Sequence, residues 1–210
     1  MMNEIRNICI SSIKRVHGRA TITLSNGETL SMPRAMLRER TYKSGMPFDR
    51  QAFEGFIRER SYSFALEKAV ALLAARARSE KEIVDCLRKN AYPEVTIAKV
   101  MARLQESGYI NDADFAAQWT MARTSRGVGS RRIRMELRQK GIDVSEIDQA
   151  LDSIDEEEML NSALKMAQKA AKGKNIADPA DRQKVLAALA RRGYDFTTAR
   201  RALQILMENE

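Results

Sequence analysis

The chain has 210 residues, with 36 Lys and Arg against 28 Asp and Glu, which gives a formal net charge of +8. Its apolar content suffices for a packed core, and its basic balance favours an acidic partner such as nucleic acid or a nucleoprotein. Two cysteines, Cys9 and Cys86, exclude a disulfide framework, and the absence of an apolar run of roughly 18 residues excludes a membrane span.

The first residues, Met1-Met2-Asn3-Glu4-Ile5-Arg6, lack the apolar stretch of a signal peptide. We therefore expect a cytoplasmic protein that contacts no membrane.

Residues 8–33 predict a small β-meander. Polar residues alternate with apolar or small ones in residues 19–24 and 28–32, and Ser25-Asn26-Gly27 lies between these two runs. Because Asn-Gly tolerates the positive φ angles of a type I′ turn, this pattern predicts a β-hairpin. Ile8, Ile10, Ile13 and Val16 predict a further strand before it, and Pro33 ends the meander.

The rest of the sequence is typical of helices. Phe53, Phe56 and Ile57 share one face of a helix expected from about residue 49 to 60. Later helices are marked by capping patterns at Ser79-Glu80-Lys81-Glu82 and Asp143-Val144-Ser145-Glu146, and glycines mark their ends at Gly108, Gly127, Gly141, Gly173 and Gly193.

The organising feature is an internal repeat. Leu87, Leu137 and Leu189, spaced by 50 and 52 residues, each follow an aliphatic residue four positions earlier. Each is followed by basic residues, a small residue and a large apolar one. The small residue is Gly141 or Gly193 in two copies, where a turn after the helix favours a left-handed conformation, and Ala91 in the first.

An amphipathic helix follows each copy, and a leading helix precedes it, beginning near Ser63, Asp112 and Glu156. The sequence therefore predicts a mainly α protein of three tandem three-helix modules in an elongated array, with a small N-terminal β-meander. The expected divisions are residues 1–61, 62–110, 111–155 and 156–210.

The densest charge lies in the second module, where residues 123–140 contain seven basic side chains and one acidic one, Glu136. Arg131, Arg134 and Arg138 share a helix face, and the stretch from Arg126 to Ser130 is expected to be a flexible lead-in to that helix. One interpretation is a solvated surface. The other is a contact face for phosphate or carboxylate, which the predominance of Arg favours.

The candidate binding residues are the basic side chains of the second module and two of the third: Arg123, Arg126, Arg131, Arg132, Arg134, Arg138, Lys140, Arg191 and Arg192. Weaker basic sets occur at Arg88 and Lys89 and at Arg200 and Arg201. Phe115, Trp119, Tyr92, Tyr109 and Tyr194 are interpreted as packing residues, with base stacking as the alternative for Phe115 and Trp119.

No catalytic constellation emerges. The single histidine, His17, and two distant cysteines predict no zinc site, and Gly127-Val128-Gly129 lacks the context of a nucleotide-binding loop. We expect no enzyme activity, no metal and no cofactor.

Three segments of the chain are similar to one known family. The stretch Arg126-Gly-Val-Gly-Ser-Arg-Arg-Ile-Arg-Met-Glu-Leu-Arg-Gln-Lys-Gly-Ile142 resembles the most recognisable segment of the RecX family. Residues 79–83, after the Leu-rich residues 72–78, resemble its opening signature, and residues 108–116 resemble the junction between its first two modules. The similarity is strong over residues 63–142 and weaker elsewhere. Ala91 replaces the usual Gly, and residues 172–178 lengthen the third module.

The resemblance implies helical modules lying in the groove of a RecA–DNA filament, with the basic helix around residues 131–140 facing it. It also implies a non-enzymatic regulator that inhibits ATP hydrolysis and strand exchange by the recombinase, and so modulates recombination and DNA repair. We expect the protein to be a monomer. Binding to single- or double-stranded DNA is a further expectation.

Two other functions remain open from the residues themselves. Three-helix units resemble helix-turn-helix domains, which would make the protein a general DNA-binding module. A row of stacked helices also suits a scaffold for other protein partners.

Overall fold

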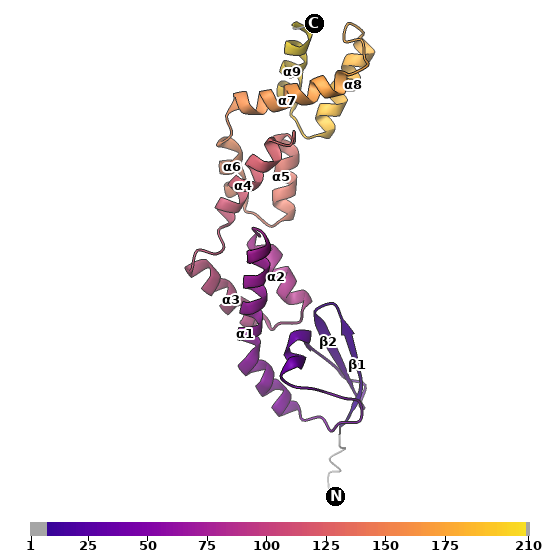
Figure 1. The fold of residues 1–210 in the computed structure, drawn as a ribbon, viewed down its shortest axis with the longest axis vertical. Coiled ribbons are helices and arrows are strands. Elements are labelled where there is room, and N and C mark those ends of the chain that lie inside the picture. Colours follow the sequence, from indigo (N-terminus) through magenta and orange to yellow (C-terminus); the bar gives the residue numbers. More distant parts are fainter. Residues whose placement is uncertain (1–7, 209–210) are drawn as a thin grey trace, which may run out of the picture. The chain divides into compact units, whose positions relative to one another are not determined.

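The structure is a computed structural model that describes residues 8–208. The expectation about the first six residues lies outside this range. The described elements are β1 (Ile10–Val16), β2 (Arg19–Leu24), β3 (Thr29–Pro33), η1 (Arg34–Arg38), α1 (Arg50–Ala75), α2 (Glu80–Lys89), α3 (Glu94–Glu106), α4 (Asp112–Thr124), α5 (Ser130–Gln139), α6 (Val144–Asp152), α7 (Glu156–Ala171), α8 (Pro179–Arg191) and α9 (Phe196–Glu208) (Figure 1). The chain divides into two compact units, one ending at Ile110 and one beginning at Asn111.

The predicted meander is confirmed as an antiparallel sheet in the order β1-β2-β3. Its second turn differs from the predicted type I′ turn. Leu24 donates to Glu28 O at 2.8 Å, which encloses a three-residue loop, and in this loop only Gly27 has a positive φ, of 83°. Because a three-residue loop needs one left-handed residue rather than two, Asn26 keeps an ordinary conformation, and its side chain accepts from the N–H of Glu28 at 3.0 Å.

One continuous helix, α1, replaces the two helices expected over residues 49–60 and from Ser63 onward. No Gly or Pro interrupts residues 56–75, and Ser61, at the expected break, is buried and shares a 2.8 Å hydrogen bond with Thr96 of α3. A division between residues 61 and 62 would cut this helix. The sheet also shares one apolar core with α1, α2 and α3, which form the first module. The other expected module limits stay predictions.

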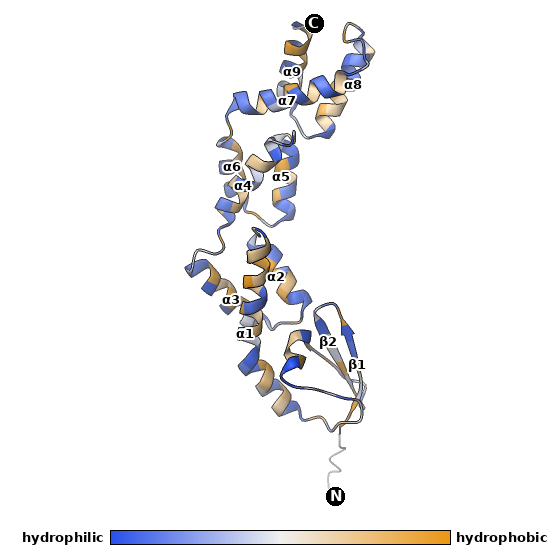
Figure 2. Ribbon diagram, in the orientation of Figure 1, coloured by the Kyte–Doolittle hydropathy of each residue, from blue (hydrophilic) through white to orange (hydrophobic). Residues whose placement is uncertain are grey.

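Two further helix trios make up the second unit. The second module is α4–α6 around a core that includes Ile133, Leu137 and Ile147, and the third is α7–α9 around Val185 and Leu189. The leading helices of these two modules, expected to begin near Asp112 and Glu156, begin at these residues. Figure 2 shows apolar and hydrophilic residues side by side along the helices, as expected of amphipathic helices that bury one stripe.

The repeat is confirmed residue by residue at its turns. Ala91, Gly141 and Gly193 have φ angles of 63°, 83° and 89°. In each turn the following large residue donates its N–H to the repeat leucine, as Tyr92 does to Leu87 O at 3.2 Å. The first module therefore adopts the same turn although its residue is Ala, because the helix-terminating hydrogen bonds impose the conformation.

Most of the predicted packing residues are confirmed: Tyr92, Tyr194 and Phe115 are buried, and Trp119 packs against the core of the second module. Tyr109 is an exception, since 67% of it is exposed. It follows Gly108 in the link between the two units, where its ring finds no core. Within residues 8–208, no helix is long and apolar enough to cross a membrane.

Candidate functional site

The candidate site lies where the second and third modules meet, and backbone hydrogen bonds hold the two together. Gly129 donates to Arg192 O and Arg131 donates to Gly193 O, both at 3.0 Å. The first N–H groups of a helix have no partner within it. The carbonyls at the end of α8 therefore satisfy donors at the start of α5.

The glycines of the junction permit this contact. A Cβ added to Gly129 would lie 2.3 Å from the backbone nitrogen of Tyr194, and one added to Gly193 would lie 2.4 Å from Cβ of Arg132. Gly127, Val128 and Gly129 are all buried. The expectation of a flexible lead-in is therefore wrong: at Gly127 and Gly129 the third module packs too closely to leave room for a side chain.

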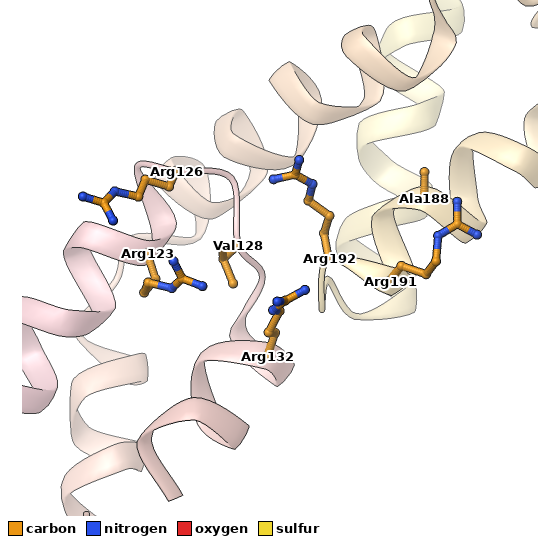
Figure 3. A pocket seen from close by; sticks show the side chains of 7 residues that line it. All are labelled: Arg123, Arg126, Val128, Arg132, Ala188, Arg191 and Arg192. Atoms are coloured by element: carbon orange, nitrogen blue, oxygen red, sulfur yellow. The ribbon is translucent and has the colours of Figure 1, made fainter. Parts of the chain in front are cut away.

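Five arginines line a hollow of about 540 Å³ at this junction, together with Val128 and Ala188. We call it the arginine hollow. Arg123, Arg126 and Arg132 come from the second module, and Arg191 and Arg192 come from the end of α8 in the third, as Figure 3 shows. The fold thus brings together five of the nine candidate residues from positions as far as 69 residues apart in the sequence.

A single carboxylate organises one side of the hollow. Glu136 accepts from Nε and Nη2 of Arg123 at 2.7 and 2.5 Å, and from Nε of Arg132 at 3.3 Å. It also accepts from the indole N–H of Trp119 at 3.2 Å. Burial acts to raise the pKa of Glu136, but the hydrogen bonds and charge of Arg123 together with the hydrogen bonds from Trp119 and Arg132 outweigh it, so the pKa lies below its usual value.

The other cations of the hollow keep their binding capacity. Arg126 and Arg191 are exposed and form no ion pair with any carboxylate between residues 8 and 208. Arg192 donates to Gly127 O at 3.4 Å. One carboxylate against five guanidinium groups leaves a strongly positive concavity, in which planar donors can bind an oxyanion in a bidentate manner.

The remaining four candidates do not line the hollow. Arg131 and Arg138 are exposed on α5, whereas Arg134 forms an ion pair with Asp148 of α6. The Nζ atom of Lys140 lies 4.2 Å from the centre of the Trp119 ring, a cation–π contact that also covers this ring.

Two features of the site were missed by sequence reasoning. Glu136 was noted only as the lone acid of a basic stretch, although its position four residues after Arg132 indicates a pair on one helix face. The convergence of Arg191 and Arg192 with the second module has no local signal, because it depends on module packing.

Within the described range, no three His, Cys, Asp or Glu side chains gather as a metal site would require.

Fold and site together define a class of protein: tandem three-helix modules with a basic hollow between two of them. Models of the first, second and third three-helix domains of RecX match residues 65–104, 111–151 and 156–203. The chain belongs to the RecX family of regulatory proteins.

Sequence similarity to curated relatives extends over most of their length. The chain is 36% identical to "Regulatory protein RecX" of Mycolicibacterium vanbaalenii over 147 residues, which are 66% of this chain and 80% of the relative. It is 33% identical to that of Mycolicibacterium smegmatis over 175 residues, 80% and 90% of the two chains.

Solved structures share the fold. The crystal structure of RecX from Lactobacillus salivarius has a TM-score of 0.66 at 22% identity, covering 70% of this chain and 97% of that one. A second crystal structure of a regulatory protein RecX has a TM-score of 0.63 at 23% identity, covering 97% and 100%.

Proposed function

We propose that this protein binds the filament that a RecA-type recombinase forms on DNA and inhibits ATP hydrolysis and strand exchange by that filament. It acts as a monomer and without enzyme activity of its own. In doing so it modulates recombination and DNA repair. Membership of a family of regulatory proteins supports this role.

The arginine hollow is the observation that carries the proposal. A nucleoprotein filament presents oxyanions at regular intervals, as carboxylates of the protein and phosphates of the DNA. Clustered guanidinium groups bind both kinds of oxyanion with directional hydrogen bonds. The hollow is built by two modules, so its shape depends on the fold and not on one helix alone.

The contact residues proposed for the filament are the five arginines of the hollow together with four further basic side chains on α5 or at its C-terminal end: Arg123, Arg126, Arg131, Arg132, Arg134, Arg138, Lys140, Arg191 and Arg192. Arg123, Arg132 and Arg134 already hold carboxylates of this chain. Arg126 and Arg191 form no ion pair within residues 8–208, so their guanidinium groups are assigned the largest share of the contact.

The test is to titrate the protein into a RecA-type recombinase assembled on single-stranded DNA and to follow ATP turnover. Turnover should fall as the protein is added, and the protein should sediment with filaments but not with free recombinase. Unchanged turnover over a wide range of concentrations would contradict the proposal.

A further inference from the structure

A second basic hollow adjoins the arginine hollow. It has a volume of about 440 Å³ and runs along α7, and its charged lining residues are all cationic: Arg126, Lys165, Lys169 and Lys172. We call it the lysine groove. Arg126 lines both hollows, so the two meet at this side chain.

Lys165 and Lys169 share one face of α7, and Lys172, the residue directly after the helix, continues this face. They lie four and three residues apart, which corresponds to steps of about 6 and 4.5 Å along the helix axis. All three are exposed, and none forms an ion pair with a carboxylate of the described chain. Lysines near a helix C-terminus can serve only to stabilise the helix through its dipole. Lys165 lies in the middle of α7, where this stabilisation is negligible, so the helix dipole does not explain its presence.

Acidic residues limit the groove at one end. Asp155, Glu157 and Glu158, at the start of α7, line a neighbouring hollow that also includes Lys165. A polyanion is repelled from these first turns and attracted to the later ones. A bound chain of negative charges therefore extends from Lys172 past Lys165 to Arg126, and from there into the arginine hollow.

The residues that line the lysine groove and the arginine hollow suit phosphates better than a protein segment. Protein partners are usually anchored by large apolar side chains in apolar pockets. Here the apolar lining consists of Val128, Ala188 and Met166, and among residues 8–208 no aromatic side chain lines either hollow. The nearby Trp119 has its indole N–H bonded to Glu136 and its ring covered by Lys140, so it offers no platform for a base.

We propose that the lysine groove and the arginine hollow form one track that binds the phosphodiester backbone of a nucleic-acid strand without reading its bases. The strand crosses from the third module to the second at Arg126. This inference rests on the proposed function only for its setting, a filament on DNA, and it concerns a contact that the protein makes with nucleic acid directly.

The experiment measures binding of a fluorescently labelled oligo(dT) to the full chain by anisotropy, without recombinase, over a series of salt concentrations. Each phosphate contact with a single strand contributes about −0.7 to the slope of log affinity against log salt. Replacing Lys165, Lys169 and Lys172 by Gln should therefore make the slope about 2 less steep. Oligo(dA) and oligo(dC) should bind with affinities similar to that of oligo(dT).

The matched control replaces three exposed lysines of the first unit, Lys14, Lys43 and Lys99, by Gln. It changes the net charge equally and should leave the slope unchanged. Equal slopes for the two triple variants would overturn the proposal. So would displacement of the oligonucleotide by poly-L-glutamate at equal charge concentration, because the track would then bind carboxylates as well as phosphates. Inhibition of the recombinase by the variant with Lys165, Lys169 and Lys172 replaced is measured separately. Failure of the nucleic-acid proposal would therefore not contradict the proposed function.

Discussion

The backbone N–H of Gly129 donates to the carbonyl oxygen of Arg192 at 3.0 Å, and this bond joins the start of α5 to the end of α8. It fixes where Arg191 and Arg192 lie relative to Arg126 and Arg132. Ser162 strengthens the same junction, because its hydroxyl donates to Thr124 O at 2.7 Å and shares a 2.9 Å hydrogen bond with Tyr194. The geometry of the arginine hollow therefore depends on module packing.

Replacing Gly129 by Ala should destabilise the second unit by about 3 kcal/mol, because the new methyl group meets the backbone nitrogen of Tyr194 at 2.3 Å. Trp119 is the only tryptophan and lies in α4, so its fluorescence during urea unfolding reports on this unit. Gly55→Ala is the control. Its Cβ meets nothing within 4 Å in α1, and it should be neutral or slightly stabilising. A Gly129→Ala protein as stable as the parent would show that the junction is loose.

Replacing Ala91 by Gly should stabilise the first module by about 1 kcal/mol. Ala91 has a φ of 63°, a conformation that costs an L-residue with a side chain more than it costs glycine. Thermal unfolding followed by far-ultraviolet circular dichroism measures the gain. The reverse change in the second module, Gly141→Ala at a φ of 83°, should cost a similar amount. Equal stability of both variants and the parent would contradict the assignment of strain to this turn.

Replacing Glu136 by Gln should cost about 1–2 kcal/mol at neutral pH, because Arg123 and Arg132 then lose their shared counter-charge. Since Trp119 donates to the same carboxylate, its emission should also shift in the folded protein. Urea unfolding detected through Trp119 measures the cost. Unchanged emission and stability of the variant would contradict the role of Glu136 in holding Arg123 and Arg132 in place.

The stabilising effect of Glu136 should depend on pH in one direction. Its pKa is lower in the folded than in the unfolded chain, so its contribution is fully present above the unfolded value of about 4.3 and disappears as the pH falls through the folded value. The stability difference between the parent and Glu136→Gln should therefore shrink on acidification below about pH 4. A difference that stays constant from pH 7 to pH 3 would contradict this.

Much of the fold follows from local patterns. The buried Leu87, Leu137 and Leu189 and the left-handed residues after them mark the three modules, because each module repeats the same helix-ending hydrogen bonds. The patterns fail where tertiary contacts decide. Serine is a residue type that is common at helix ends, yet Ser61 lies inside the continuous helix α1, where it is hydrogen-bonded to Thr96.

The candidate site is predictable only in part. The basic stretch identifies Arg123, Arg126 and Arg132, but neither charge nor periodicity indicates that Arg191 will lie opposite them. Gly127-Val128-Gly129 is ambiguous for the same reason. Small residues permit flexibility and also permit close packing, and only the position of Tyr194 distinguishes these two roles.

The central claim is that the arginine hollow contacts the filament, and one comparison tests it most directly. Arg126 and Arg191 line the hollow without an ion pair in the described chain, so replacing both by Gln removes binding groups while leaving the Glu136 contacts in place. Arg200 and Arg201, exposed on α9 and outside the hollow, provide a control pair with the same charge change. The measurement is the concentration of each protein that halves ATP turnover by a RecA-type recombinase on single-stranded DNA. That concentration should rise about tenfold or more for Arg126→Gln/Arg191→Gln, since tenfold corresponds to 1.4 kcal/mol, and it should stay within about twofold for Arg200→Gln/Arg201→Gln. Equal inhibition by the two variants would contradict the account.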